Sequence, residues 1–368
     1  MRFRWNYTFR QFTGDTLGGA IAALIALPYG LAMASLMGLP PVLGLFTSLL
    51  TAPITALLGR NPVLIGGTAS ATVPFIALAV QAQGIGGAAK VCLAASVFMM
   101  AFCVLRLGRH ITRVPHSVVS GFSCGIGGLM VISQLRTMTG IASPVDVTSS
   151  NSMMQLWQVA SRWDQARWYP MLLAGVVILV SILVARRFPK VPAPLMGVIA
   201  ACLIYGFAPG EKEVGALPLS LPPFAGFTWM PSDVYTVLPS ALALALISSV
   251  NILITSRVVE HFRGRHRPLK PVDADTELGA YGIANVCAAM FGAPLSVGIP
   301  ARSLASIRCG GSTRVSNVIH AIFIYAFVAL GAGLVSHIPM AALAGVTAYI
   351  GLCLLDWGAW RRLPIMRT

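Results

Sequence analysis

Ten apolar stretches, each about as long as a helix that crosses a lipid bilayer, run through this sequence. A helix needs about 20 apolar residues to span the hydrocarbon core. Inside lipid every backbone N–H and C=O group needs a partner, and a helix supplies those partners within one segment. Spanning helices are therefore predicted near residues 16–34, 41–58, 88–107, 115–135, 168–186, 192–208, 236–258, 274–292, 314–336 and 339–356.

The composition indicates an integral membrane protein rather than a soluble one. Hydrophobic residues make up 56% of the chain and charged residues only 10%, and the mean hydropathy is +0.78. Such a chain has too little polar surface to cover a soluble domain. The net charge of +15 would suggest a nucleic-acid partner in a soluble protein, but here the basic residues lie in short clusters between apolar stretches. We therefore expect the chain to contact the lipid bilayer and no nucleic acid.

The distribution of Lys and Arg predicts the orientation in the membrane. If the N-terminus lies inside, twenty of these residues fall on the inner side of the predicted spans and five on the outer side. In membrane proteins the cytoplasmic loops carry the excess of Lys and Arg. Both termini are therefore expected in the cytoplasm, with a bacterial inner membrane as the location. The loop 136–167 and the Pro-rich segment 209–235 are then external.

Two further apolar stretches, near 68–81 and 300–309, are too short to cross a bilayer. With the ten full spans they give about twelve segments of an all-α, multi-pass membrane protein. The stretches open on the sequences Ile65-Gly66-Gly67-Thr68-Ala69-Ser70 and Ser296-Val297-Gly298-Ile299-Pro300-Ala301-Arg302. Broken helices in corresponding halves of a transporter usually mark the substrate site.

Arg302 is the strongest functional signal, because it places a permanent charge in the first turn of the second short stretch. An Arg at the centre of a membrane costs about 2.5–3.5 kcal/mol on insertion scales, and such residues usually have a function. A helix start also offers unpaired N–H groups and the positive end of the helix dipole. The expected ligand is an anion. The candidate donors come from both helix starts: Arg302, Ala301, Ser303, Thr68, Ala69 and Ser70.

The alternative role for Arg302 is a structural charge paired with a carboxylate, for which Glu277 is the nearest candidate in the sequence. Other chemistry has little support. The seven Cys residues are scattered singly, without the spacing of a metal site. No His, Cys or carboxylate cluster has the spacing needed for nucleophilic catalysis. We therefore expect neither an enzyme nor a bound metal ion or cofactor.

Short motifs along nearly the whole chain resemble those of one membrane family. They begin with Gly14-Asp15, Ala26-Leu27-Pro28-Tyr29-Gly30-Leu31-Ala32 and Gly38-Leu39-Pro40-Pro41-Val42-Leu43-Gly44-Leu45. Further motifs lie near 105–108, 115–122, 277–285, 301–303, 338–345 and 356–357. In this order they resemble the sulfate permease (SulP) family of anion transporters.

The resemblance implies a fold of fourteen segments in two inverted repeats of seven, arranged as a core domain and a gate domain. In that fold two half-helices meet at mid-membrane with the anion between their starts, and the core moves against the gate in an elevator-like step. For this chain it implies a first repeat over 1–208, an external linker over 209–235 and a truncated second repeat over 236–368. The implied substrates are small anions such as sulfate, bicarbonate, chloride or dicarboxylates.

Three positions depart from the family pattern, and one of them is Pro300, an added residue before Ala301-Arg302. Many bacterial relatives carry an acid in the eighth segment that is implicated in cation or proton coupling, whereas the matching residue here is Asn251, followed by Thr255. An amide cannot titrate and is a poorer partner for a cation, so sodium or proton coupling through this position is not expected. Tyr29 stands where relatives commonly have Gln, and it joins the predicted anion site.

Compared with the family pattern, the chain is expected to lack the last two membrane segments and the cytoplasmic STAS domain, either as a natural short form or as a fragment. Two alternatives to an anion transporter stay open. One is a non-transporting membrane scaffold or degenerate subunit that needs a partner. The other, less favoured, is a nucleobase transporter, whose site would use carboxylates where Asn251 and Arg302 stand here. Whether the chain forms a homodimer is also open.

Overall fold

The structure, a computed structural model, describes residues 7–108, 116–141, 152–188, 191, 193–208, 210–215, 228–263 and 271–355. Parts of the predicted loop 136–167, of the linker 209–235 and of the last span near 339–356 lie outside these residues. The motif at 356–357 lies outside them entirely.

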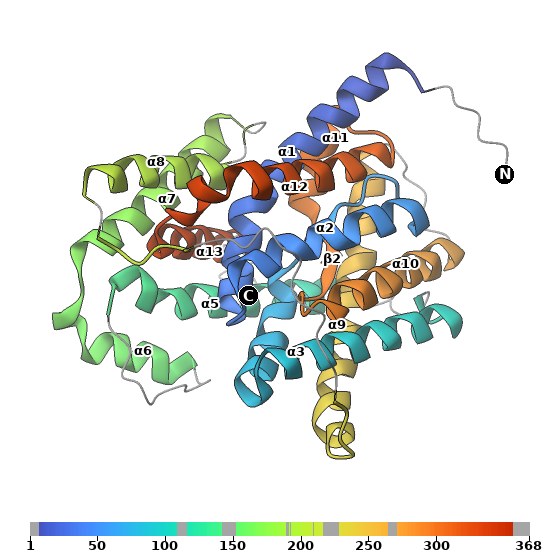
Figure 1. Ribbon diagram of the computed structural model, residues 1–368, viewed down its shortest axis with the longest axis horizontal. Helices are drawn as coiled ribbons and strands as arrows, with labels where there is room; N and C mark the ends of the chain where they lie inside the picture. The colour runs from blue at the N-terminus through green and yellow to red at the C-terminus, as the bar shows by residue number, and fades with distance from the viewer. Residues whose placement is uncertain are drawn as a thin grey trace, which may run out of the picture. The chain divides into compact units, whose positions relative to one another are not determined.

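Twelve α-helices make up most of the described chain (Figure 1). Their bounds are α1 Phe9–Leu36, α2 Pro41–Leu58, α3 Val73–Val104, α5 His116–Thr139, α6 Ser152–Ser161, α7 Trp168–Arg187, α8 Ala193–Phe207, α9 Asp233–Phe262, α10 Pro271–Met290, α11 Pro300–Arg308, α12 Val315–Ser336 and α13 Met340–Leu354. Two short 3-10 helices, η1 Ser70–Thr72 and η2 Trp163–Gln165, and two strands, β1 Gly66–Thr68 and β2 Ser296–Gly298, complete the elements.

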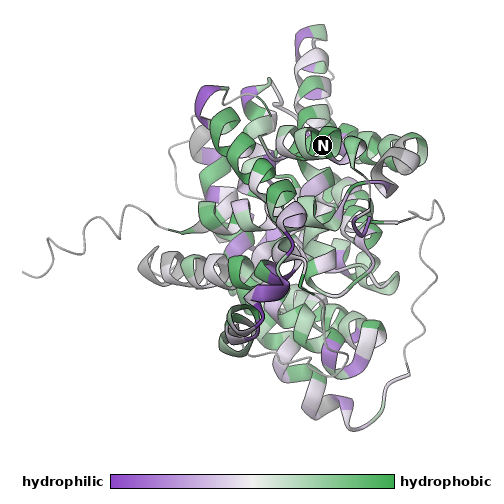
Figure 2. Cartoon of the chain, turned by 90° about the vertical axis from the view of Figure 1, so that its left-hand side faces the viewer, coloured by the Kyte–Doolittle hydropathy of each residue, from purple (hydrophilic) through white to green (hydrophobic). Residues whose placement is uncertain are grey.

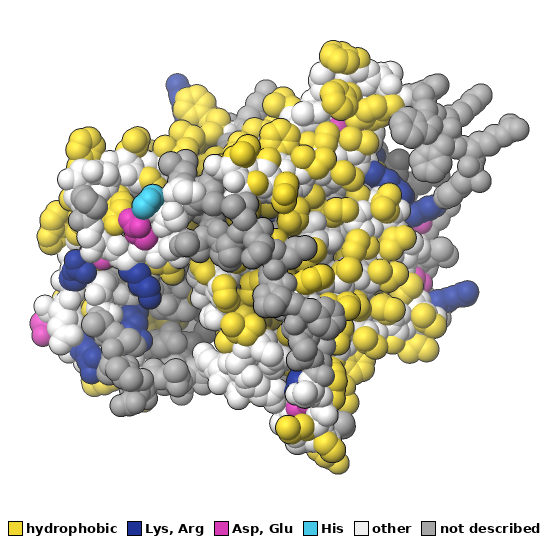
Figure 3. Space-filling view, in the orientation of Figure 1, with side chains coloured by type: hydrophobic (Ala, Val, Ile, Leu, Met, Phe, Trp, Pro, Cys, Tyr) yellow, Lys and Arg dark blue, Asp and Glu magenta, His cyan; other side chains and the backbone are white. Residues whose placement is uncertain are grey.

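The described helices have the length and surface of membrane segments. Five stretches are long and apolar enough to cross a membrane: α1, α2, Ser70–Val104, α7 and Tyr235–Glu260. Hydrophobic residues colour most of the helices in Figure 2 and much of the face in Figure 3. Leu57, Val104, Phe207 and Leu330 are each more than 70% exposed. Soluble proteins rarely expose so much apolar surface, so these side chains are placed to contact lipid.

The chain forms two compact units, each built from two separate stretches of sequence. The first contains Met1–Arg113 and Gly215–Ser336, and the second contains Val114–Val214 and His337–Thr368. Both strands and both of the predicted short stretches belong to the first unit. The second unit has its own core, in which Leu173 and Val177 of α7 pack with Ala342 and Val346 of α13.

The two short apolar stretches meet through a two-stranded antiparallel sheet that the sequence does not predict. Gly66 pairs with Gly298, Gly67 with Val297 and Thr68 with Ser296. After β2 the chain enters α11, in line with the predicted stretch 300–309. After β1 it enters η1 and then α3, which changes direction at Gly84 (φ 68°, ψ −168°) before the predicted span near 88–107.

Side chains supply the hydrogen-bond partners that the outer edge of this small sheet needs. Such non-helical backbone is tolerated at membrane depth only where protein groups pair with it. Asn285 of α10 pairs with both backbone groups of Ser296: its Oδ1 accepts from the amide at 2.7 Å, and its Nδ2 donates to the carbonyl at 2.9 Å. Asn285 therefore takes the place of a third strand beside β2.

Hydroxyl and amide groups complete the pairing around the strands. Thr255 Oγ1 donates to the carbonyl of Gly298 at 3.2 Å, and Thr47 Oγ1 donates to that of Pro294 at 3.0 Å. Ser303 Oγ accepts from the amide of Ile65 at 2.9 Å. Two residues singled out in the sequence, Thr255 and Ser303, thus bind the backbone of the broken stretches.

The Gly14-Asp15 motif fixes the other end of α11. Asp15 is fully buried, and its Oδ1 accepts from the amides of Ser312 at 2.7 Å and Thr313 at 3.0 Å. A Cβ on Gly14 would lie 2.5 Å from the carbonyl oxygen of Gly310. Only glycine allows this approach of α1 to the turn after α11, so the motif holds α11 from its C-terminal end.

Replacement of Asn285 by Ala is expected to lower the stability of the first unit. It leaves the amide and the carbonyl of Ser296 buried without a partner, and each unpaired group costs about 1–3 kcal/mol. We expect a lower melting temperature in detergent, equivalent to about 2–4 kcal/mol. Ile283→Ala is the control, because Ile283 lies on the same helix and is 44% exposed. Equal melting temperatures for the two variants would contradict the role of Asn285.

Candidate functional site

Arg302 lies in the first turn of α11 and is fully buried. Its Nη1 donates to Ser48 Oγ of α2 at 2.9 Å and to the carbonyl of Gly66 at 3.4 Å. Its guanidinium carbon lies 5.2 Å from the centroid of the Tyr29 ring, a cation–π distance. Nε and Nη2 have no hydrogen-bond partner within the part of the chain that the structure describes.

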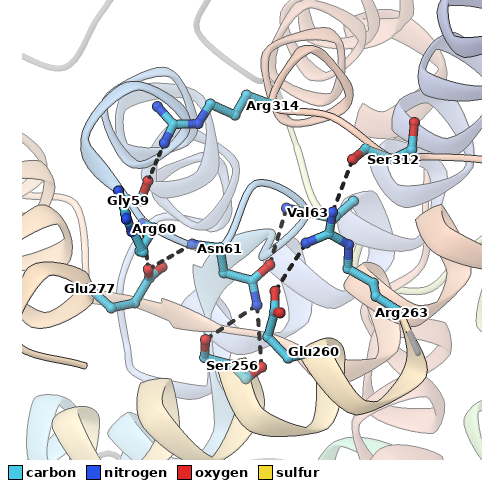
Figure 4. Close-up of polar contacts among 10 residues, drawn as sticks. All are labelled: Gly59, Arg60, Asn61, Val63, Ser256, Glu260, Arg263, Glu277, Ser312 and Arg314. Atoms are coloured by element: carbon cyan, nitrogen blue, oxygen red, sulfur yellow. Dashed lines mark hydrogen bonds and ion pairs between the residues drawn. The ribbon is translucent and has the colours of Figure 1, made fainter. Parts of the chain in front are cut away.

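Glu277 does not neutralise Arg302. Its Oε2 instead accepts from the backbone amides of Arg60 at 2.7 Å and Asn61 at 3.0 Å, in the loop between α2 and β1 (Figure 4). Over the described ranges, the ion pairs of the protein do not include Arg302. The arginine therefore carries a buried charge that these residues leave without a carboxylate.

The loop that Glu277 holds leads directly into β1, so the contacts in Figure 4 position the site from one side. Asn61 Nδ2 donates to Ser256 of α9, and Arg314 donates to the carbonyl of Gly59. Arg314 also donates to the carbonyl of Leu57. Together these bonds connect the end of α2 with α9, α10 and the start of α12. They fix the backbone of Gly66, which Arg302 contacts.

The start of α11 offers backbone donors beside Arg302. No side chain of the described residues caps this helix, and Pro300 at its first position has no N–H group. The amides of Ala301 and Arg302 lie in the first turn, where a helix provides no acceptor. Ala301 is exposed although its neighbours Arg302 and Ser303 are buried, so this turn is open on one side.

Tyr29 of α1 contacts both helix starts. Its ring faces Arg302, and its hydroxyl accepts from the amide of Ser70, the first residue of η1, at 3.3 Å. No side chain caps η1 at Ala69. The hydroxyl of Thr68, the last residue of β1, is buried without a partner among the described residues. Arg302 and Thr68 therefore supply an unbalanced positive charge and a free hydroxyl, while Tyr29 occupies the amide of Ser70.

The remaining predicted residues have other positions. Ser303 and Thr255 use their hydroxyls on backbone carbonyls and amides, as described above. Asn251 contacts Thr255, whose hydroxyl lies 3.3 Å from Asn251 Oδ1. The pair therefore lies on α9 beside β2, with an amide at the position where a coupling acid is expected.

Three residues beside Arg302 are absent from the predicted site: Ser48, Gly66 and Gly67. A Cβ on Gly67 would lie 2.1 Å from Nη1 of Arg302 and 2.6 Å from Ser48 Oγ. The sequence did offer a sign of Gly67, because the pair Gly66-Gly67 stands just before a predicted helix start. Ser48 had none, because it is one of several hydroxyl residues on α2 and lies 254 positions from Arg302.

The arrangement suits reversible binding of an anion. A guanidinium with two free nitrogens, next to the amides in the first turn of a helix, is a favourable partner for oxyanions. Metal chemistry has no comparable support: no group of three His, Cys, Asp or Glu side chains that would hold an ion occurs in the described part of the chain.

Comparison with known proteins gives consistent results. A model of the sulfate permease family matches residues 12–367. The sequence is 29% identical over 371 residues to the bicarbonate transporter BicA of Synechocystis sp., a match that covers 96% of this chain and 63% of that protein. It is 28% identical over 379 residues to the "Probable sulfate transporter Rv1739c" of Mycobacterium tuberculosis, covering 100% of this chain and 66% of that protein. The chain thus spans just under two thirds of the length of these relatives.

Solved structures share the fold. The transmembrane domain of a cyanobacterial bicarbonate transporter BicA superposes with a TM-score of 0.87 at 28% identity, over 96% of this chain and 91% of that chain. The murine anion transporter Slc26a9 in its inward-facing state gives a TM-score of 0.81 over 95% of this chain and 62% of that one, at 19% identity, a likeness of fold alone. These likenesses confirm the predicted multi-pass helical fold. The relatives are transporters rather than enzymes, as expected for this chain.

Proposed function

Because the chain belongs to the sulfate permease family, we propose that it is a secondary transporter of small anions. One observation carries the proposal: Arg302 is a buried cation with two unpartnered nitrogens and no carboxylate partner among the described residues. Binding an anion there neutralises a charge that is otherwise costly at membrane depth. The site consists of Arg302 and Ala301 of α11, Tyr29 of α1, and Thr68, Ala69 and Ser70 before α3.

The proposed substrates are sulfate, bicarbonate, chloride or a dicarboxylate. All of them accept hydrogen bonds from a guanidinium and from backbone amides. The names of relatives support the first two, since BicA is described as a bicarbonate transporter and Rv1739c as a probable sulfate transporter.

We further propose elevator-like alternating access, in which the first unit carries the anion. Every residue of the proposed site belongs to that unit, which is formed from both stretches that contain a broken segment. Sodium or proton coupling through α9 is not part of the mechanism, because Asn251 has no ionisable group. Uptake is therefore expected to be the same in sodium and in potassium salts. A clear stimulation by sodium would contradict this role of Asn251.

Uptake into liposomes tests the proposed function. The purified chain is reconstituted, and entry of radiolabelled sulfate, bicarbonate and chloride is measured beside the Arg302→Ala variant. We expect uptake of at least one anion and its loss in the variant. Uptake unchanged by the substitution would contradict the site. A correctly folded chain without any uptake would contradict transport and favour a scaffold.

The Tyr29→Phe variant is expected to bind the anion more tightly. The Tyr29 hydroxyl occupies the amide of Ser70, and an anion at this helix start competes with it. Removing the hydroxyl frees the amide and keeps the ring over Arg302. Since one hydrogen bond contributes about 0.5–1.5 kcal/mol, affinity should rise roughly 2–10-fold. Tyr325→Phe on α12 is the control, because Tyr325 is 58% exposed. Weaker binding in Tyr29→Phe alone would mean that the hydroxyl itself contacts the anion.

The predicted location in a bacterial inner membrane with both termini in the cytoplasm also belongs to this proposal. Its support is the excess of Lys and Arg on one side of the predicted spans. A homodimer stays a prediction.

A further inference from the structure

Three exposed tryptophans lie close together in the sequence of the second unit. Trp157 of α6 is 70% exposed, Trp163 of η2 is 57% exposed, and Trp168 at the start of α7 is 73% exposed. Met153, one turn before Trp157, is 76% exposed. Large apolar side chains in a loop surrounded by water would expose a substantial hydrophobic surface without gain.

The ends of the loop that contains α6 are held at the level where two helices end. The amide of Arg167 donates to the carbonyl of Thr139, the last residue of α5, at 2.8 Å. Arg167 also forms an ion pair with Glu211, which follows α8, at 2.7 Å. The loop thus begins and finishes on the same side of the unit, where α5 and α8 end and α7 begins. Since α7 is long and apolar enough to span the membrane, this end lies near a membrane surface.

The side chains of α6 separate into a buried side and an exposed side. Val159 is buried and packs in the unit, where α6 lies beside α5 (Figure 1). Met153 and Trp157 are four residues apart and therefore lie on one side of the helix. Gln158 is about 100° further around the helix axis. Met153 and Trp157 are thus left exposed on the side of α6 away from Val159, without a protein partner in the described chain.

We propose that the segment from α6 to Trp168 is a lipid-contacting interfacial element of the second unit. Trp157 and Met153 contact lipid, and Trp163 and Trp168 lie at the level of the lipid headgroups. Tryptophan is enriched at this level because its ring is largely apolar and its N–H group needs a polar partner. The neighbouring Arg162 suits anionic headgroups. By the predicted orientation, the lipid belongs to the external leaflet.

The continuity of this segment with α7 indicates that lipid covers its exposed side chains. Trp168 is both the last of the three tryptophans and the first residue of a helix that spans the membrane. Lipid is therefore already the neighbour at one end of the segment, and the tryptophans extend this contact. The inference depends on the membrane location alone and not on the proposed anion transport.

Fluorescence quenching tests this placement. Of the seven tryptophans in the chain, six are replaced by Phe so that only Trp157 remains. The protein is reconstituted in phosphatidylcholine and phosphatidylglycerol vesicles. We expect strong quenching by lipids with a nitroxide near the headgroup, and iodide quenching about threefold weaker than for free tryptophan amide in water. If this variant does not fold, the otherwise native chain with Trp157→Phe should lose part of its quenching by the same lipids.

A matched control moves the probe around the helix. Trp157→Phe combined with Gln158→Trp, in the same background, moves the tryptophan about 100° around α6 toward the buried Val159, and we expect weaker quenching by the nitroxide lipids than for Trp157. Equal quenching of the two probes by the nitroxide lipids, or no effect of these lipids on either probe, would overturn the proposal. Protection of Trp157 from both quenchers would also overturn it, because a protein surface would then cover this side.

Discussion

Gly67→Ala is expected to reduce anion binding by about one to two orders of magnitude, since it overpacks the site. The added Cβ would lie 2.1 Å from Nη1 of Arg302 and 2.6 Å from Ser48 Oγ. Gly67 cannot easily retreat, because it pairs with Val297 in the sheet. The guanidinium must therefore leave its position. Overpacking of this kind costs about 1–3 kcal/mol, equivalent to roughly 5–150-fold in a binding constant. Equilibrium binding of the transported anion measures the effect.

Gly86→Ala is the matched control for this prediction. Gly86 lies in the same unit, and a Cβ added there would have no heavy atom of the described residues within 4 Å, so an alanine fits without displacement. Binding should equal that of the unchanged chain. If Gly67→Ala binds the anion as well as Gly86→Ala does, Arg302 does not act from the position described above.

Arg302→Met is expected to remove anion binding and yet leave the anion-free protein as stable as before or more stable. A buried charge without a carboxylate partner destabilises the fold, and replacing buried charges by apolar side chains of similar size is often stabilising by about 1–4 kcal/mol. A structural ion pair would behave in the opposite way, because breaking it costs about 3–5 kcal/mol. The free energy of unfolding in detergent without added anion separates these roles.

Arg308→Met provides the reference for this experiment. Arg308 lies at the other end of α11 and is exposed, so its replacement should change the unfolding free energy by less than about 0.5 kcal/mol. A large loss of stability in Arg302→Met, with little change in Arg308→Met, would mean that Arg302 is a structural charge.

The sequence predicted the apolar spanning helices because apolar length is a local property, but it missed α6 and η2, which lie in the predicted loop 136–167. The second short stretch, predicted near 300–309, corresponds to α11 at Pro300–Arg308. The sequence did not predict the strands. Gly66–Thr68 and Ser296–Gly298 have only three residues each, and each strand forms by pairing with the other, some 230 positions away in the sequence. A periodic pattern needs a longer segment.

Partners of the site residues were hard to predict for the same reason. Glu277 is the nearest acid to Arg302 in the sequence, but in space it pairs with the amides of Arg60 and Asn61. The hydroxyls of Ser303 and Thr255 were predicted beside the ligand or the coupling site, and each also binds backbone at the broken stretches. Hydroxyl residues are common in membrane helices, and the sequence alone does not separate those that support the backbone from those that meet a ligand.

The central claim is that an anion binds at Arg302, between the starts of η1 and α11. Thermal unfolding at increasing sulfate, bicarbonate or chloride tests it most directly, with the unchanged chain and Arg302→Gln side by side. A ligand at 100 times its dissociation constant stabilises the folded state by about 2.7 kcal/mol. We predict a saturable stabilisation of the unchanged chain by at least one of these anions and none for Arg302→Gln over the same range. Equal stabilisation of both proteins, or of neither, would contradict the account.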